Sequence, residues 1–238
     1  MIEIPTDTGP LPVFVARPDG DGPWPAVVVL HDVYGMTTDV KNQARWLASE
    51  GYLAAAPDLY RGARTVGCMV RTLGDLMRGR DGEVVAHIAA TRQWLLADAC
   101  TGRVGVIGFC MGGGFALMVA PKGLFDVAAP NYGPLSPAAA AALGGACPIV
   151  ASYGAKDPML PGEAARLERH LSARGVPHDI HVYPDAAHGF LNDHVPEELP
   201  WLFLRVGGLA GTRHHAPSAA HARGRILTFF ERYLREAP

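Results

Sequence analysis

The residues best suited to chemistry in this 238-residue chain surround a cysteine that is flanked by glycines. The segment reads Gly108-Phe109-Cys110-Met111-Gly112-Gly113 and follows an apolar run at 104–107. Gly-x-Cys-x-Gly between a strand and a helix is the nucleophile-elbow pattern with cysteine in place of serine. The turn is so sharp that its central residue is strained, and side chains at Gly108 and Gly112 would collide with neighbouring backbone. We therefore predict that Cys110 is the nucleophile of an acyl-transfer reaction.

Two other interpretations of this segment are weaker. A cysteine before a glycine-rich helix start can be a buried structural residue, because free cysteine is often buried. A glycine-rich turn can also bind a dinucleotide, but here Cys110 occupies the place of the second glycine and no acidic strand end follows about 20 residues later. In the elbow, the positive end of the helix favours a thiolate. The amide of Met111 would then face a developing oxyanion.

An aspartate and a histidine follow the cysteine in the order that an α/β-hydrolase requires, which is nucleophile, acid and then histidine. Asp157 comes just after the predicted strand at 147–153, and His188 lies on the loop after the predicted strand at 178–183. We therefore predict a triad of Cys110, Asp157 and His188. Asp185 is the main competitor for the acid, but it is too close to His188 along the same loop.

A second oxyanion donor should come from the loop after an early strand. The sequence Leu30-His31-Asp32-Val33-Tyr34-Gly35 has this form, so we assign the donor to the amide of Val33. His31 is expected to pack or to hydrogen-bond beneath the loop. The other histidines lack the strand-end placement, and the adjacent pair His214-His215 is a poor metal site. No metal and no cofactor is predicted.

The elements that must position these residues alternate between strands and helices. Strands are predicted at 11–17, 26–30, 52–56, 103–107, 126–129, 147–153 and 178–183, and helices at 40–50, 83–97, 110–120, 162–173 and 219–234. This alternation predicts one α/β domain over residues 1–238, with a mainly parallel central sheet and helices on both faces. The segments 61–82 and 191–218 are predicted to be irregular and to border the active site, the first with room for a short helix. Asp39 and Asp81 are predicted helix caps.

The composition limits the class of partner. Lys and Arg number 21, Asp and Glu number 23, and the net charge is -2, so nothing favours nucleic acid or a membrane surface. We find no signal peptide and no apolar run of about 18 residues. The four cysteines, which lack CxxC spacing, indicate reduced thiols in a cytoplasm. We expect a cytoplasmic enzyme for a small-molecule substrate, either a monomer or a homodimer.

Together these segments resemble the dienelactone hydrolase (carboxymethylenebutenolidase) family. The resemblance rests on His31-Asp32-Val33-Tyr34-Gly35, Ala56-Pro57-Asp58-Leu59-Tyr60, the Cys110 elbow, Gly154-Ala155-Lys156-Asp157 and Ala187-His188-Gly189-Phe190. It implies the α/β-hydrolase fold and the opening of an enol-lactone through a thioester, with Cys110, His188 and Asp157 as the triad. It also implies an acidic residue against the resting thiol. Asp32 occupies that place, one methylene shorter than the usual glutamate.

The chain departs from this family where the substrate carboxylate would bind. Family members hold it with arginines, one of them a few residues past the catalytic histidine, but residues 190–193 here are Phe-Leu-Asn-Asp. Candidate replacements are Arg61, Arg64, Arg71, Arg78, Arg80, Arg205 and Arg213. Of the possible substrate contacts we select Tyr34, Arg71 and Phe190. Two alternatives stay open: a general carboxylesterase or thioesterase, and a catalytically silent binding or redox-responsive scaffold.

Overall fold

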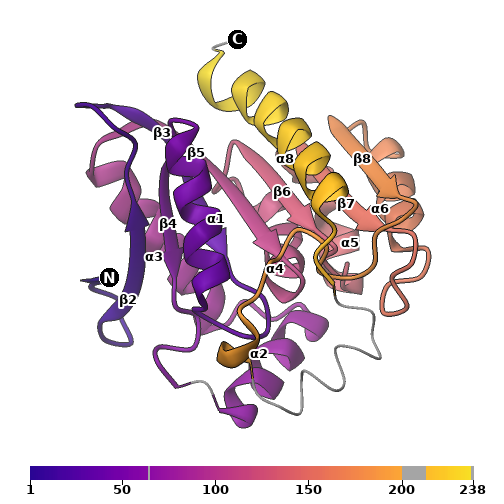
Figure 1. Ribbon diagram of the computed structural model, residues 1–238, viewed down its shortest axis with the longest axis horizontal. Coiled ribbons are helices and arrows are strands. Elements are labelled where there is room, and N and C mark those ends of the chain that lie inside the picture. The colour runs from indigo at the N-terminus through magenta and orange to yellow at the C-terminus, as the bar shows by residue number, and fades with distance from the viewer. Residues whose placement is uncertain (64, 200–212, 237–238) are drawn as a thin grey trace.

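Eight strands form one sheet in the order β1-β2-β4-β3-β5-β6-β7-β8 (Figure 1). This computed structural model describes residues 1–63, 65–199 and 213–236. The two antiparallel pairings are β1 with β2 and β2 with β4, and the remaining pairings are parallel. The prediction of a mainly parallel sheet is confirmed. The strands are β1 (Ile2–Ile4), β2 (Leu11–Ala16), β3 (Trp24–Leu30), β4 (Leu53–Pro57), β5 (Cys100–Phe109), β6 (Val127–Asn131), β7 (Ile149–Gly154) and β8 (His178–Tyr183).

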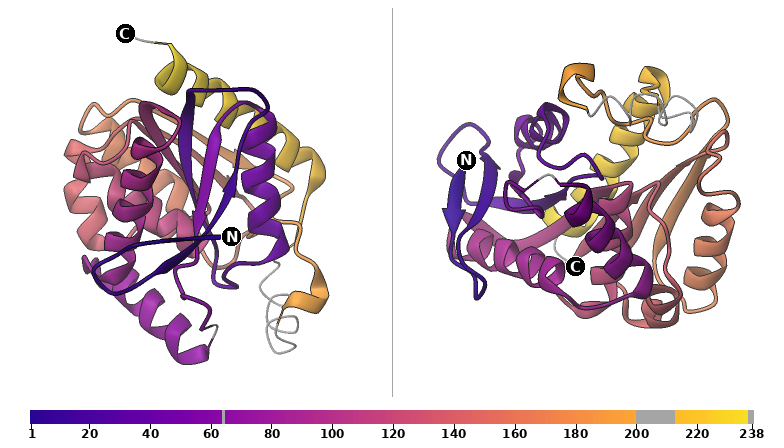
Figure 2. Two further views of the ribbon diagram at one scale, coloured as in Figure 1. Left: turned by 90° about the vertical axis from the view of Figure 1, so that its left-hand side faces the viewer. Right: turned by 90° about the horizontal axis from the view of Figure 1, so that it is seen from below.

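Helices cover both faces of this sheet (Figure 2). One face carries α1 (Thr38–Ser49) and α8 (Ala216–Phe230), and the other carries α3 (Glu83–Ala97), α4 (Met111–Val119) and α6 (Glu163–Ser172). Two further helices, α2 (Val66–Arg78) and α5 (Pro137–Ala142), pack against α4. Short 3-10 turns cover Ala120–Lys122, Leu143–Gly145 and Pro196–Glu198, and α8 continues as a π-helical turn over Glu231–Arg235. Within the described ranges, no helix has both the length and the apolarity needed to cross a bilayer.

The central strands are buried on both faces, which explains their continuous apolar sequences. In β3, every side chain from Ala26 to Leu30 is inaccessible to solvent. The register pairs Leu30 with Gly108, Phe109 with Asn131, and Gly154 with Tyr183. The ends of the parallel strands are therefore aligned, and the residues that follow them gather at the carboxyl edge of the sheet, where open α/β sheets bind ligands.

The segment at 61–82 is more regular than predicted, because 13 of its residues form α2. The side-chain oxygen of Thr65 accepts a hydrogen bond from the amide of Cys68, and Gly79 ends the helix in the left-handed conformation. Met69, Thr72 and Leu76 are buried at helical spacing. Glycines within this segment obscure that spacing in the sequence, because glycine lowers helix propensity.

The predicted caps Asp39 and Asp81 are wrong. The capping residues are Thr37 and Gly82, and neither makes a side-chain cap bond. At the start of α1 the carboxylate of Glu198 accepts hydrogen bonds from the amide of Thr38 at 2.7 Å and from its hydroxyl at 2.6 Å. A carboxylate that is distant in the sequence therefore accepts the hydrogen bonds of this helix start, and no local sequence pattern could reveal this contact.

The other boundaries differ by a few residues. Asp81 forms an ion pair with Lys122 at 2.6 Å on the surface, which is a different role from the predicted cap. The last helix begins at Ala216, three residues before its predicted start at 219, so the irregular segment is shorter than expected. Residues 200–212 of that segment lie outside the described ranges.

Candidate active site

Cys110 lies between β5 and α4 in a strained conformation, with φ 52° and ψ −115°. A positive φ is uncommon for a residue with a side chain, and such residues cluster at functional sites. Its amide donates to the carbonyl of Asn131 at 3.1 Å, and its carbonyl accepts from the amide of Gly114 at 3.0 Å. The backbone on both sides thus holds the half-buried thiol at the carboxyl edge of the sheet.

The glycines of this turn are required by close backbone contacts. A Cβ atom at Gly108 would lie 2.1 Å from the carbonyl oxygen of Gly112, and one at Gly112 would lie 2.4 Å from that of Leu30. Real Cβ atoms do not approach backbone so closely, so a side chain at either position would push the start of α4 away from β3 and β5. The steric prediction for these two glycines is confirmed.

His188 is held by Asp157 through a short, buried hydrogen bond. The distance from Nδ1 of His188 to Oδ2 of Asp157 is 2.7 Å, and the two side chains are 5% and 1% exposed. The other oxygen of Asp157, Oδ1, accepts from the amide of Met159 at 2.8 Å. Because both oxygens have partners, the carboxylate cannot rotate freely, and it fixes the plane and the tautomer of the imidazole.

The loops that carry these two residues meet at Gly154. A Cβ atom at this position would lie 2.5 Å from the carbonyl oxygen of Ala186. Asp185, the competing acid, points elsewhere: its carboxylate is 69% exposed and lies 3.1 Å from Nζ of Lys156. The structure therefore brings Asp157, and not Asp185, to the histidine.

The second ring nitrogen of His188, Nε2, is buried near Cys110. Among the described residues it has no partner in full hydrogen-bond geometry. Burial alone would lower the pKa of His188. The charge of Cys110 and the hydrogen bond to Asp157 outweigh burial and raise that pKa well above its ordinary value. The arrangement therefore favours the protonated form of the imidazole beside Cys110.

We expect the pKa of His188 to fall when Cys110 is replaced by alanine, because the variant lacks the largest contribution that raises it. The imidazolium of the wild-type protein then persists to higher pH than that of Cys110→Ala. NMR titration of the His188 imidazole in both proteins measures the difference. The midpoint of His178, whose pKa is shifted by burial and by Val176 and Glu168, serves as the internal control. Equal His188 midpoints would contradict this account.

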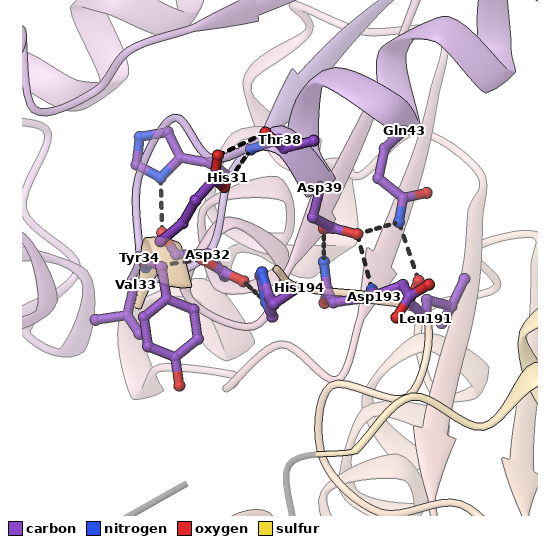
Figure 3. Close-up of polar contacts among 12 residues, drawn as sticks. His31, Asp32, Val33, Tyr34, Thr38, Asp39, Gln43, Leu191, Asp193 and His194 are labelled. Atoms are coloured by element: carbon purple, nitrogen blue, oxygen red, sulfur yellow. Dashed lines mark hydrogen bonds and ion pairs between the residues drawn. The ribbon is translucent and has the colours of Figure 1, made fainter. Parts of the chain in front are cut away.

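A buried polar network lies behind His188. The ring of Tyr132 packs edge-on against the imidazole at 5.2 Å, and its hydroxyl donates to Oδ1 of Asn192 at 2.6 Å. Nδ2 of Asn192 donates to Asp39 on α1 at 2.5 Å, and the amide of Asp193 donates to the same carboxylate at 2.8 Å. Figure 3 shows Asp39 facing this loop. The network fixes the loop after His188 to α1.

Asn192→Ala should reduce the free energy of unfolding by about 2 kcal/mol, because it leaves buried polar partners unsatisfied. Burial raises the pKa of Asp39, and the hydrogen bond from Asn192 opposes that rise by favouring the carboxylate. The deficit should therefore be larger at neutral than at acidic pH, where Asp39 is protonated. Urea unfolding measures it. Asn42→Ala, at an exposed site on α1, is the control and should change stability by less than about 0.5 kcal/mol.

The two predicted oxyanion donors have free amides. Among the described residues, the amide of Val33 has no acceptor, and Met111 is the first residue of α4, where helical amides lack partners. Val33 follows β3 and Met111 follows β5, two neighbouring parallel strands. The assignment of both as oxyanion donors stays a prediction.

Asp32 lies at the same edge, but its carboxylate is already engaged. Oδ1 accepts from the amide of Tyr34 at 2.8 Å, and Oδ2 lies 2.8 Å from Nε2 of His194 (Figure 3). Burial lowers the pKa of His194, but the hydrogen bond and charge of Asp32 outweigh burial and raise it. Within the described ranges, the carboxylate of Asp32 makes no hydrogen bond to the thiol of Cys110. The carboxylate of Asp32 forms an ion pair with His194, and its role near the resting thiol stays a prediction.

The predicted substrate contacts have different outcomes. Phe190 is fully buried between the rings of Tyr132 and Tyr183, so it has no surface to offer a substrate and this prediction is wrong. Tyr34 is half-buried and packs edge-on against His194 at 5.0 Å. Arg71 is exposed on α2, and its role stays a prediction.

The candidates for binding a substrate carboxylate also include Arg213, Arg205 and Arg64. Arg213 is exposed, and its amide donates to the carbonyl of His188 at 3.3 Å, so its backbone lies directly beside the histidine. Arg205 lies outside the described residues, as does Arg64.

Several residues of this site are not among those predicted from the sequence. Tyr132 has φ 38° and follows β6, so its position just past a predicted strand was an available signal. Tyr60 also follows a strand, and its hydroxyl lies 3.0 Å from the carbonyl oxygen of Val33. For Asn192 and His194 no local signal exists, because their partners Asp39 and Asp32 are far away in the sequence.

The chain resembles one protein family over nearly its whole length. The model of the dienelactone hydrolase family matches residues 11–234. A carboxymethylenebutenolidase from Rhodococcus opacus is 30% identical over 251 residues, which cover 95% of this chain and 88% of the relative. A provisionally named carboxymethylenebutenolidase from Escherichia coli (strain K12) is 31% identical over 248 residues, which cover 97% and 85%.

Solved structures also resemble this chain. A dienelactone hydrolase-like promiscuous phosphotriesterase from metagenomic libraries has a TM-score of 0.82 at 22% identity, covering 98% of this chain and 96% of that one. This likeness supports the α/β-hydrolase fold that the sequence predicts.

Proposed function

The chain belongs to the dienelactone hydrolase family and is an ester or lactone hydrolase, and from this premise we propose that Cys110, His188 and Asp157 carry out its reaction. The observation that carries the proposal is the buried 2.7 Å bond between His188 and Asp157, with the second nitrogen of the imidazole beside a strained cysteine. Nucleophile, base and orienting carboxylate are the parts that acyl transfer needs.

In the proposed cycle the thiolate of Cys110 attacks the carbonyl carbon of the ester. A carbon–sulfur bond forms, and the carbonyl electrons move to oxygen, which the amides of Val33 and Met111 stabilise. Collapse of this intermediate breaks the carbon–oxygen bond and gives a thioester, while the imidazolium of His188 gives its proton to the leaving oxygen and becomes neutral. His188 then removes a proton from water, which attacks the thioester and releases the acid and the thiolate.

Intact-mass measurement after mixing with p-nitrophenyl acetate tests the proposed nucleophile. We expect a mass increase of one acetyl group in the wild-type protein and none in Cys110→Ala. Acetylation that persists in the variant, or that maps to another residue, would contradict the assignment. It would also favour a silent or differently organised site.

The substrate class within the family is proposed more broadly, as an enol-lactone or a related carboxylic ester. An enolate leaving group is a weak base, which suits a thiolate nucleophile. Specific observations also favour the second candidate, a general carboxylesterase or thioesterase. Residues 190–193 contain no arginine, and Asn192, in that stretch, is buried in the network behind His188.

Comparison of kcat/KM for a carboxylate-bearing dienelactone and for neutral aryl esters separates these two candidates. A clear preference for the dienelactone supports the lactonase. A preference for neutral esters supports the general esterase and would exclude the first candidate. Arg213, the exposed arginine beside His188, is the residue to replace if the anionic substrate is preferred.

A further inference from the structure

We propose that His31 and Tyr60 are positioning residues of the oxyanion hole, because they fix the peptide groups on both sides of Val33. The inference rests on the proposed function, in which Cys110 attacks an ester carbonyl. It assigns a role to two buried side chains that the triad mechanism does not use.

His31 is fully buried at the end of β3, and its two ring nitrogens have different partners. Nε2 lies 3.1 Å from the amide nitrogen of Leu59, and Nδ1 lies 2.6 Å from the carbonyl oxygen of Asp32. An amide can only donate, so Nε2 must be the unprotonated nitrogen and Nδ1 must carry the proton. Burial lowers the pKa of His31, which agrees with this neutral form.

This tautomer fixes the orientation of one peptide group. The proton on Nδ1 holds the carbonyl of Asp32 on the side of the imidazole, as Figure 3 shows. The peptide bond between Asp32 and Val33 is trans, so its N–H points away from its C=O. The amide of Val33 is therefore directed away from His31, and it has no acceptor within the described ranges.

Tyr60 fixes the next peptide group. Its hydroxyl lies 3.0 Å from the carbonyl oxygen of Val33 and 3.5 Å from Sδ of Met111. Its ring packs against His31 at 4.9 Å. One side chain thus contacts both residues whose amides are assigned to the oxyanion hole.

Tyr60 is itself rigid and remains a donor. Asp58 accepts hydrogen bonds from the amides of Tyr60 at 3.1 Å and Gly62 at 2.8 Å, which fixes the turn after β4. Burial raises the pKa of Tyr60, and the charges of Asp32 and Cys110 raise it further. The phenol therefore keeps its proton throughout the working pH range.

A loosened oxyanion hole slows only those steps that create an oxyanion. Acylation of Cys110 by an ester passes through a tetrahedral intermediate with a negative oxygen. Alkylation by iodoacetamide forms a carbon–sulfur bond and releases iodide, and no oxyanion develops. The two reactions share the thiolate but not the amides, so together they separate positioning of the hole from damage to the nucleophile.

Tyr60→Phe removes the hydroxyl and leaves the ring. We expect the rate of acylation by p-nitrophenyl acetate to fall about tenfold, which corresponds to about 1.4 kcal/mol. This is less than the factor of about 10² to 10³ for removing an oxyanion donor outright, because the Val33 amide remains. KM and the rate of iodoacetamide alkylation should not change.

Tyr153→Phe is the matched control, because the buried hydroxyl of Tyr153 also donates to a backbone carbonyl, that of Gly133, at 3.0 Å. The Tyr153→Phe variant should lose about as much folding stability as Tyr60→Phe, but its rate of acylation should not fall. At the second position, His31→Gln keeps a donor and an acceptor, and it should retain more acylation activity than His31→Leu. Equal rates for these two variants would remove His31 from the proposal.

The remaining outcomes for Tyr60→Phe are also decisive. Unchanged acylation would overturn the proposal for Tyr60, and so would a parallel fall in acylation and alkylation, which would place the effect on the thiolate. If the wild-type Cys110 were neither acylated nor alkylated, the proposed function itself would fail, which is a distinguishable result.

Discussion

Ester hydrolysis by the Cys110→Ala variant should be slower than that of the wild type by a factor of about 10⁴ in kcat/KM. Such a factor corresponds to about 5 kcal/mol of lost transition-state stabilisation. The variant retains the amides of Val33 and Met111 and the base His188, so a small residual rate is expected. Initial rates with p-nitrophenyl acetate provide the measurement.

Cys147→Ala is the control for this substitution. Cys147 precedes β7 and therefore lies at the amino end of the sheet, away from Cys110. Burial raises the pKa of its thiol to about 12, so it is protonated and unreactive at neutral pH. Its removal should leave kcat/KM unchanged. If Cys110→Ala kept a tenth or more of the wild-type rate, Cys110 would not be the nucleophile.

Asp157→Asn should lower kcat by a factor of about 10³ to 10⁴ while leaving the fold intact. The amide of Met159 donates to one oxygen of this side chain, so the oxygen of the new asparagine must remain there. The NH₂ group must then face Nδ1 of His188, from which Oδ2 accepts a hydrogen bond at 2.7 Å in the wild type. The imidazole would be forced to carry its proton on Nε2, the nitrogen near Cys110, and could not act as a base.

Asp185→Asn controls for the loss of one carboxylate in the same region. Asp185 is exposed and pairs with Lys156, and exposed pairs contribute little. Its kcat should change by less than about twofold. Because the tautomer is the cause of the predicted defect, NMR of the His188 ring should show the proton moved to Nε2 in Asp157→Asn. A kcat close to the wild-type value would rule out the orienting role of Asp157.

The parts of the site that the sequence predicts are those encoded locally. An apolar strand followed by a glycine turn marks Cys110, and strand ends mark Asp157 and His188 in the same way. Even the steric need for Gly108 and Gly112 follows from the sharpness of a single turn. The parallel sheet then brings these local signals together, because strand registers align their carboxyl ends.

The parts that the sequence does not reveal depend on partners far apart in the chain. The carboxylate of Asp32 binds His194, and the start of α1 is satisfied by Glu198. Neither pair has a sequence spacing from which the contact could be predicted. Phe190 illustrates the opposite error, because its position two residues after the histidine predicts a substrate contact, whereas the loop buries its side chain in the core.

The network of Asp39, Asn192 and Tyr132 has a consequence for when activity arises during folding. It connects the first helix after β3, the end of β6 and the loop after β8, so the histidine is held in place only when sequence-distant segments have docked. Contacts of such long sequence separation form late, since they require closure of large chain loops. A partly folded or truncated chain would expose the cysteine without an aligned histidine beside it. Only the fully folded protein is therefore expected to hydrolyse esters.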